Sequence, residues 1–311
     1  MRNVKIMMLM MAACLAGCSS DDEPQNPVTQ NTESKKTETQ KTETPRLMYV
    51  DVMDAPEGGD AAAPLLASHR AGAPITTATL SSFYMNYESN QYGFTKNGTW
   101  STNYWPSVGD NTKIDFYAYT AGTFNYNSGN PYVAFTVEET VDHQHDLLVA
   151  EHKNISRNDD EGHVSLCFDH ACAAVLFTVQ ITNTLHTKLK GNLTVKSIVL
   201  KNVIKTGDYY YNTGNTGAWT INDINENYAD YTVTTGNITV TTTPQTVAQG
   251  YLYMIPQKRS ASGTSGTYLD ITYIKGSEDQ HATIPLSIDW KAGQYYPINI
   301  KLGTTLIELP S

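Results

Sequence analysis

Short runs in which every second residue is apolar recur from Arg46 onward. In one run, Val175, Phe177, Val179 and Ile181 occupy alternate positions. Similar runs are Ile114–Ala118, Leu269–Tyr273 and Tyr296–Leu302. Runs that alternate with a period of two and are rich in Val, Ile, Thr and Tyr are typical of half-buried antiparallel strands. Turn formers separate the runs, and no long amphipathic helical pattern is present. We therefore predict an all-β chain built of antiparallel β-sandwich domains.

The length of the chain predicts more than one domain. The sequence has 311 residues, and a domain usually takes about 100–200. The polar stretch Asn183–Asn192 divides the strand-forming part into similar halves, which predicts an N-terminal domain over 46–183 and a C-terminal domain over 184–311. Asn154–Gly162 is an alternative boundary.

The charge of the chain excludes one class of partner. It carries 21 Lys and Arg against 31 Asp and Glu, a formal net charge of −10. Binding to a nucleic-acid backbone requires clustered Lys and Arg. We therefore expect no nucleic-acid partner.

The N-terminus predicts export. Two basic residues, Arg2 and Lys5, precede an apolar run that is too short to span a bilayer, as in a secretory signal peptide. Leu15-Ala16-Gly17-Cys18 resembles the lipobox of bacterial lipoproteins. This resemblance implies a signal peptide over 1–17, cleavage between Gly17 and Cys18, and lipid on Cys18.

A polar segment follows the predicted lipid site. Its first residues resemble the surface-export signal of Bacteroides-type lipoproteins: Ser20, Asp21, Asp22 and Glu23. Residues 18–45 have no aromatic residue and few apolar ones, which predicts a disordered tether. A flexible coil of this length reaches roughly 30 Å. We therefore expect outer-membrane lipid to hold a surface-exposed body through Cys18.

Several short sequence segments, in a fixed order along the chain, suggest a family. They are Trp105-Pro106 with Lys113–Tyr119, His145–Ala150, Val164–His170 with Ala174–Val179, Leu252–Gln257, and Trp290–Tyr296. Together these segments resemble the fimbrillin family of Bacteroides-type pili, the Mfa-like fimbrillins. The resemblance implies two tandem transthyretin-like β-sandwich domains, no catalysis and no cofactor. Other fimbrial subunits are the implied partners.

The resemblance also implies a mode of assembly. In this family an arginine-specific protease removes the lipidated leader with the first strand, and a strand of another subunit fills the groove. Arg70 and Arg46 are the candidate cleavage sites. Cleavage at Arg70 would release a candidate first strand in which Met48, Val50 and Val52 alternate. Cleavage at Arg46 would expose no groove.

The C-terminal residues could supply the exchanged strand. Leu306, Ile307 and Leu309 form the candidate donor, although the same residues could simply complete the last strand. Stalk subunits of the family have a longer C-terminal appendage. The sequence therefore favours a tip or accessory subunit that serves cell adhesion at the fimbrium.

The sequence also bears on two other kinds of site, a metal site and a catalytic site. His143 and His145 have a spacing that metals use, but no known pattern fixes a third ligand, so we expect no metal site. No catalytic motif is present, so we expect no catalytic residues.

A surface-anchored glycan-binding lipoprotein is the alternative function. Aromatic side chains can stack on sugars of a host or bacterial surface. The candidate groups are Tyr209–Tyr211 with Trp219, and Tyr84 with Tyr87 and Tyr92.

Overall fold

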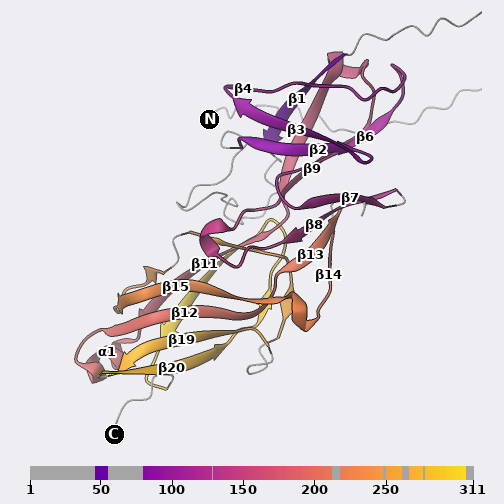
Figure 1. Cartoon of the computed structure of the whole chain (residues 1–311). Helices are drawn as coiled ribbons and strands as arrows, with labels where there is room; N and C mark the ends of the chain where they lie inside the picture. Colours follow the sequence, from indigo (N-terminus) through magenta and orange to yellow (C-terminus); the bar gives the residue numbers. More distant parts are fainter. Residues whose placement is uncertain are drawn as a thin grey trace, which may run out of the picture. The chain divides into compact units, whose positions relative to one another are not determined.

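Strands follow one another through the described chain (Figure 1). Their buried hydrophobic side chains form two cores. The computed structural model describes residues 46–54, 80–127, 129–211, 218–247, 250–260, 266–275 and 277–305. All of them belong to one compact unit, Thr44–Ser311. The predicted all-β sandwich class is confirmed, and the alternating runs near Ile114, Val175, Leu269 and Tyr296 all lie in strands.

The first core is enclosed by eight strands that pair in one continuous order. In that order they are β4 (Thr99–Trp100), β3 (Asn90–Asn97), β2 (Ser82–Tyr87), β6 (Ile114–Tyr119), β9 (Leu148–Ile155), β10 (His163–His170), β1 (Leu47–Asp54) and β5 (Asn103–Tyr104). Alternation places one face of each main strand in the core. In β10, for example, Val164, Leu166 and Phe168 are buried. Phe83 and Phe94 stack within the same core, with ring centroids 5.1 Å apart.

The second core lies among three four-stranded sheets and one strand pair. One sheet contains β16 (Gln245–Thr246), β11 (Ala173–Ile181), β17 (Leu252–Met254) and β22 (Tyr295–Leu302). The next contains β15 (Tyr228–Val240), β12 (Leu193–Ile204), β19 (Tyr268–Lys275) and β20 (Glu278–Pro285). The third contains β14 (Ala218–Ile221), β13 (Thr206–Tyr210), β8 (Asn130–Thr136) and β7 (Thr123–Asn127), and the pair is β18 (Lys258–Arg259) with β21 (Ile288–Asp289).

Two strand pairs are parallel among otherwise antiparallel neighbours in the described chain. β1 runs parallel to β10, with Tyr49 opposite His163. β22 runs parallel to β11, with Ala174 opposite Tyr295. Because β10 and β11 follow each other with only Ala171 and Cys172 between them, the first and last described strands lie beside successive parts of one extended segment.

A short helix occupies the predicted domain boundary. α1 (Asn183–Leu189) begins after Thr182, whose hydroxyl accepts a hydrogen bond from the Leu185 N–H at 3.1 Å, and it ends at Lys190 in a left-handed conformation. The 3₁₀ turns are η1 (Val141–His143), η2 (Asp159–Gly162) and η3 (Asn225–Asn227). The first core draws on residues up to Phe168, whereas β7 and β8 pair within the second set of sheets. The division at residue 183 stays a prediction.

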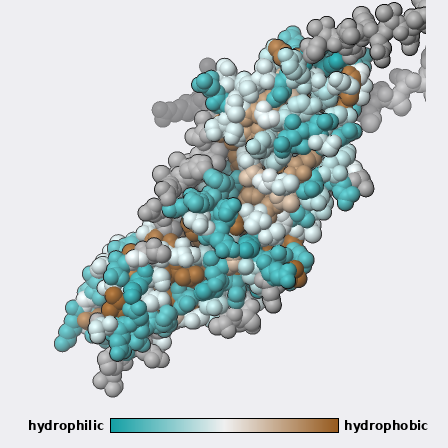
Figure 2. Space-filling view, in the orientation of Figure 1, coloured by the Kyte–Doolittle hydropathy of each residue, from teal (hydrophilic) through white to brown (hydrophobic). Residues whose placement is uncertain are grey.

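The visible face of the molecule is largely polar. Figure 2 shows hydrophilic residues over most of this face and hydrophobic residues in small groups. In the described part of the chain, no helix has the length and apolar character needed to cross a membrane.

Candidate functional site

Strand β1 supplies side chains to the first core. Met48 is fully buried and Val50 is 7% exposed, whereas Leu47, Tyr49 and Met53 on the opposite face are 42%, 38% and 50% exposed. This pattern follows directly from the two-residue alternation of the sequence. Full burial of a Met or Val side chain stabilises a fold by about 1.5–3 kcal/mol. Met48 and Val50 therefore provide much of the attachment of β1 to the core.

The backbone pairing of β1 is limited on one side. Its parallel partner β10 runs alongside from Tyr49 to Asp54. On the other side, β5 pairs only with Leu47 and Met48. Beyond Met48, β1 is therefore an edge strand within the described residues. Parallel pairing is also slightly less stable per residue than antiparallel pairing.

The beginning of β1 is held by a tryptophan and a glycine. The Trp105 backbone N–H donates to the Arg46 carbonyl oxygen at 3.0 Å, and its indole N–H donates to the Gly162 carbonyl oxygen at 3.1 Å. Gly162 has φ +89°, and a Cβ there would lie 3.2 Å from the Leu47 carbonyl oxygen. A side chain at this position would be strained and would crowd the start of β1.

The outer face of β1 carries a polar contact to β10. His163 Nδ1 lies 2.8 Å from Asp51 Oδ2, and the imidazole stacks on the Tyr49 ring with centroids 5.0 Å apart. The two polar side chains are 37% and 51% exposed, so this contact contributes at most about 1 kcal/mol. Burial of Met48 and Val50 therefore contributes more to holding β1 on the body than this polar contact does. Removal of β1 would leave an apolar groove and an unpaired edge on β10. Another strand could fill this groove and pair with that edge.

Comparison with known proteins places this fold in a family. The family model described as Fimbrillin-like matches residues 69–311. The chain belongs to the fimbrillin-like family.

Two solved structures are similar to this fimbrillin-like chain. A fimbrial protein from Bacteroides vulgatus is 16% identical, with a TM-score of 0.51 over 83% of this chain and 95% of that one. A candidate cell adhesion protein from Bacteroides uniformis is 20% identical, with a TM-score of 0.47 over 73% of this chain and 87% of that one. A search of curated proteins found no match.

The predicted assembly residues are only partly described in the fimbrillin-like structure. Met48, Val50 and Val52 lie in β1, where Val52 is half-buried. Arg46 precedes β1, and its guanidinium donates to Asn158 Oδ1 at 2.7 Å. The remaining assembly and export residues lie outside the described residues: Gly17, Cys18, Ser20, Asp21, Asp22, Glu23, Arg70, Leu306, Ile307 and Leu309. Their roles stay predictions.

One of the two predicted aromatic platforms is wrong. Tyr209 and Tyr211 are 7% and 3% exposed, because they belong to the second core. The Trp219 indole N–H donates to the Ala171 carbonyl oxygen at 2.7 Å, which turns this ring toward the protein. In the other group, Tyr84 is 46% exposed, whereas Tyr87 and Tyr92 are half-buried.

His170 and Cys172 have structural surroundings. No group of three or more His, Cys, Asp or Glu side chains among the described residues is arranged to hold a metal ion. His170 Nδ1 is hydrogen-bonded to the buried Asp146 carboxylate. Cys172 is a buried thiol outside any disulfide, and burial raises its pKa well above the ordinary value. A thiol in this state is a poor nucleophile.

Sequence reasoning found β1 but missed how it is held. The alternation of Met48 and Val50 indicated a strand, but a period of two is the same for parallel and antiparallel pairing. The contacts of Trp105 and His163 with β1 join residues more than fifty positions apart, and no local pattern reports them. The glycine in Glu161-Gly162 was the only local signal of a close approach.

Proposed function

We propose that this chain is a fimbrial subunit that assembles when β1 is exchanged for a strand of another subunit. The burial of Met48 and Val50 by a strand with limited backbone pairing carries the proposal. Residues 55–79, which include Arg70, connect β1 to the rest of the body. Cleavage after Arg70 would leave β1 attached by non-covalent contacts alone, so that a competing strand could replace it.

Export as a lipoprotein fits the same scheme. Lipid on Cys18, after cleavage at Gly17, would anchor the exported chain in the outer membrane. The acidic residues Asp21, Asp22 and Glu23 would direct it to the cell surface. Cleavage at Arg70 would then free the body from its lipid and open the groove in one step. The chain would act at the fimbrium as a tip or accessory subunit in adhesion, through assembly and without catalysis or a cofactor.

The exchanged strand has to meet two physical requirements. It must place apolar side chains in the positions of Met48 and Val50, and its backbone must pair with β10. Leu306, Ile307 and Leu309 of another subunit are the proposed donor. Until a donor arrives, the open groove would expose apolar surface and promote association.

Proteolysis of the full chain tests the proposal. The purified protein is treated with an arginine-specific protease and followed by N-terminal sequencing, intact mass and size-exclusion chromatography with light scattering. We expect a new N-terminus at Ala71, loss of the peptide that contains β1, and conversion of monomers into oligomers. Arg70→Lys should block all three changes, whereas Arg46→Lys should leave them intact.

A competing peptide makes the test specific to the groove. A synthetic peptide of residues 46–55, added in excess, should keep the cleaved protein monomeric. The same peptide with Met48→Asp and Val50→Asp should have no effect. Two results would overturn the exchange mechanism. One is a protein that is cleaved at Arg70 but stays monomeric with β1 still bound. The other is oligomer formation that the first peptide does not reduce.

A further inference from the structure

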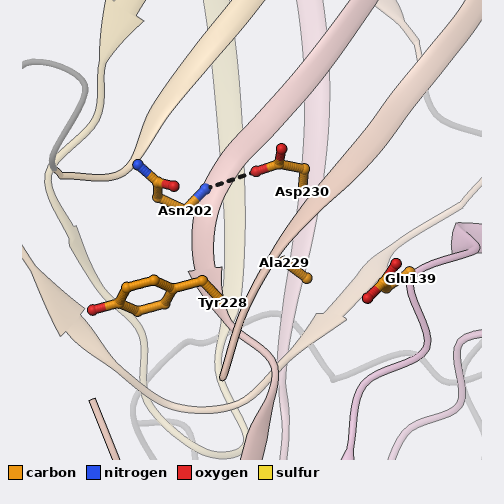
Figure 3. Close-up of a pocket in the computed structure, with 5 residues that line it drawn as sticks. All are labelled: Glu139, Asn202, Tyr228, Ala229 and Asp230. Atoms are coloured by element: carbon orange, nitrogen blue, oxygen red, sulfur yellow. Dashed lines mark hydrogen bonds between the residues drawn. The ribbon is translucent and has the colours of Figure 1, made fainter. Parts of the chain in front are cut away.

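A polar hollow of about 500 Å³ opens among the strands around the second core, at a site separate from β1 (Figure 3). Its lining residues are Glu139, Asn202, Tyr228, Ala229 and Asp230. Three of them begin β15, Asn202 lies in β12, and Glu139 follows β8. Figure 3 shows Glu139 and Tyr228 on opposite sides of Ala229. The volume is within the range of small-molecule sites, about 300–1,000 Å³.

A β-bulge shapes the wall of the hollow. The pairing of β12 with β15 shifts register between Leu200 and Val203, and Asn202 has φ +59°. The Asn202 backbone N–H donates to Asp230 Oδ1 at 3.2 Å, and its side-chain amide donates to the Gly266 carbonyl oxygen at 3.1 Å. Asn tolerates this left-handed conformation better than most residues. The bulge therefore fixes the positions of both Asn202 and Asp230.

The acidic groups of the hollow are already neutralised. Lys201 Nζ lies 2.7 Å from Asp230 Oδ2, and Lys205 Nζ lies 2.6 Å from Glu139 Oε1. Each carboxylate has about four acceptor positions, so Glu139 with its lysine, and Asp230 with its lysine and the Asn202 N–H, both keep acceptor positions for a ligand. Because each carboxylate is paired with a lysine, the hollow offers no excess charge to attract an isolated cation or anion. A neutral ligand with several hydroxyl groups could donate to the free acceptor positions of both carboxylates without disturbing this charge balance.

The aromatic wall of the hollow is held rigidly. The Arg259 guanidinium lies over the Tyr228 ring, 4.5 Å from its centroid, and donates to the Tyr228 hydroxyl at 3.0 Å. That hydroxyl in turn donates to the Asp223 carboxylate. The hydrogen bond from Tyr228 and the charge of Arg259 hold the pKa of Asp223 below its ordinary value. A ring fixed in this way costs little conformational entropy when a ligand binds.

From this arrangement we infer that the hollow is a binding site for a neutral, polyhydroxylated sugar ring. The Asp230 and Glu139 carboxylates accept from sugar hydroxyls, the Asn202 side-chain amide adds a further hydrogen bond, and Ala229 and Tyr228 provide apolar surface for the ring carbons. The site is independent of β1 exchange, because none of its residues belongs to β1 or β10.

Saturation-transfer NMR on the full chain tests the site. The probes are the methyl glycosides of glucose, galactose and mannose at millimolar concentration. We expect saturation transfer to the ring protons of at least one probe. Glu139→Ala and Asn202→Gly should each weaken its binding about tenfold, the loss expected for one hydrogen bond of about 1.4 kcal/mol. Glycine keeps the left-handed backbone of Asn202, so this variant removes the side chain without straining the bulge.

Asp279→Asn is the matched control. Asp279 pairs with Lys196 of β12 at 2.7 Å, which resembles the Asp230 pair but lies outside the hollow. This variant should bind the probe as the parent does. No saturation transfer to any of the three glycosides would overturn the proposal. Binding that survives Glu139→Ala and Asn202→Gly, or binding of calcium or inorganic phosphate that both variants abolish, would overturn it as well.

Discussion

The hydroxyl of Tyr211 donates to the carbonyl oxygen of Ala118 at 2.8 Å, across 93 positions of sequence. Tyr211 belongs to the second core and Ala118 to the first. The bond is buried, so water does not compete with it. Its surroundings raise the pKa of Tyr211 well above the ordinary value, and burial is the main cause. The two cores are therefore joined by a neutral, directional contact as well as by packing.

Two buried tyrosines should respond in opposite ways to loss of the hydroxyl. Tyr211→Phe leaves the Ala118 carbonyl without this donor and should lower the free energy of unfolding by about 1 kcal/mol. The Tyr231 hydroxyl is fully buried and has no hydrogen-bond partner among the described residues, so Tyr231→Phe should raise the free energy of unfolding by about 1 kcal/mol. Urea denaturation measures both values. Changes of the same sign would contradict the assigned hydrogen bonding.

The two methionines of β1 should differ sharply in their effect on stability. Met48 is fully buried, so Met48→Ala should lower the free energy of unfolding by about 2–5 kcal/mol. Met53 is 50% exposed on the other face, and Met53→Ala should change it by less than about 0.5 kcal/mol. Denaturant titration of the uncleaved chain compares the two. Equal effects would mean that β1 is not held by its inner face.

The Asp159 carboxylate should titrate unusually low. Hydrogen bonds from Lys113, whose Nζ lies 2.5 Å away, and from the Ser156 backbone N–H lower its pKa from 3.8 to about 2. Because the folded pKa is depressed, its stabilising effect is complete above the unfolded value and is lost as pH falls from about 4 to 2. Carbon-13 NMR should show the low pKa, and Lys113→Met should raise it toward 3.8. Lys153→Met, which removes the partner of Glu151, should not move it.

Removal of the proposed donor should separate folding from assembly. The Thr182 backbone N–H donates to the Leu302 carbonyl oxygen at 2.9 Å, and Ile181 pairs with Leu302, so β22 is secured before residue 303. A chain that ends at Thr305 should keep the thermal midpoint of the parent but form no oligomers after cleavage. Replacing Leu306, Ile307 and Leu309 with Ser should do the same. Oligomers of either variant would exclude these residues as the donor.

The sequence was most informative where a local pattern repeats. Alternation located β11 and β19, because a half-buried strand imposes a period of two on its own residues. It did not reveal α1, whose seven residues bury only Leu185 and therefore show no helical period. The polar hollow was also missed, because Glu139, Asn202 and Asp230 come from three distant segments. Such a site depends on pairing register and on one bulge, neither of which a single sequence displays.

The parallel alignment of β1 with β10 has a consequence at the scale of a whole fibre. A donor that takes the place of β1 in the same direction enters every subunit with one orientation, so donor and acceptor surfaces differ at each junction. Contacts of this head-to-tail kind give rings where the rotation between subunits closes and open filaments where it does not. The resulting filament would be polar, with an open groove at one end and an unused donor at the other. Growth and capping would then be distinct chemical events at opposite ends.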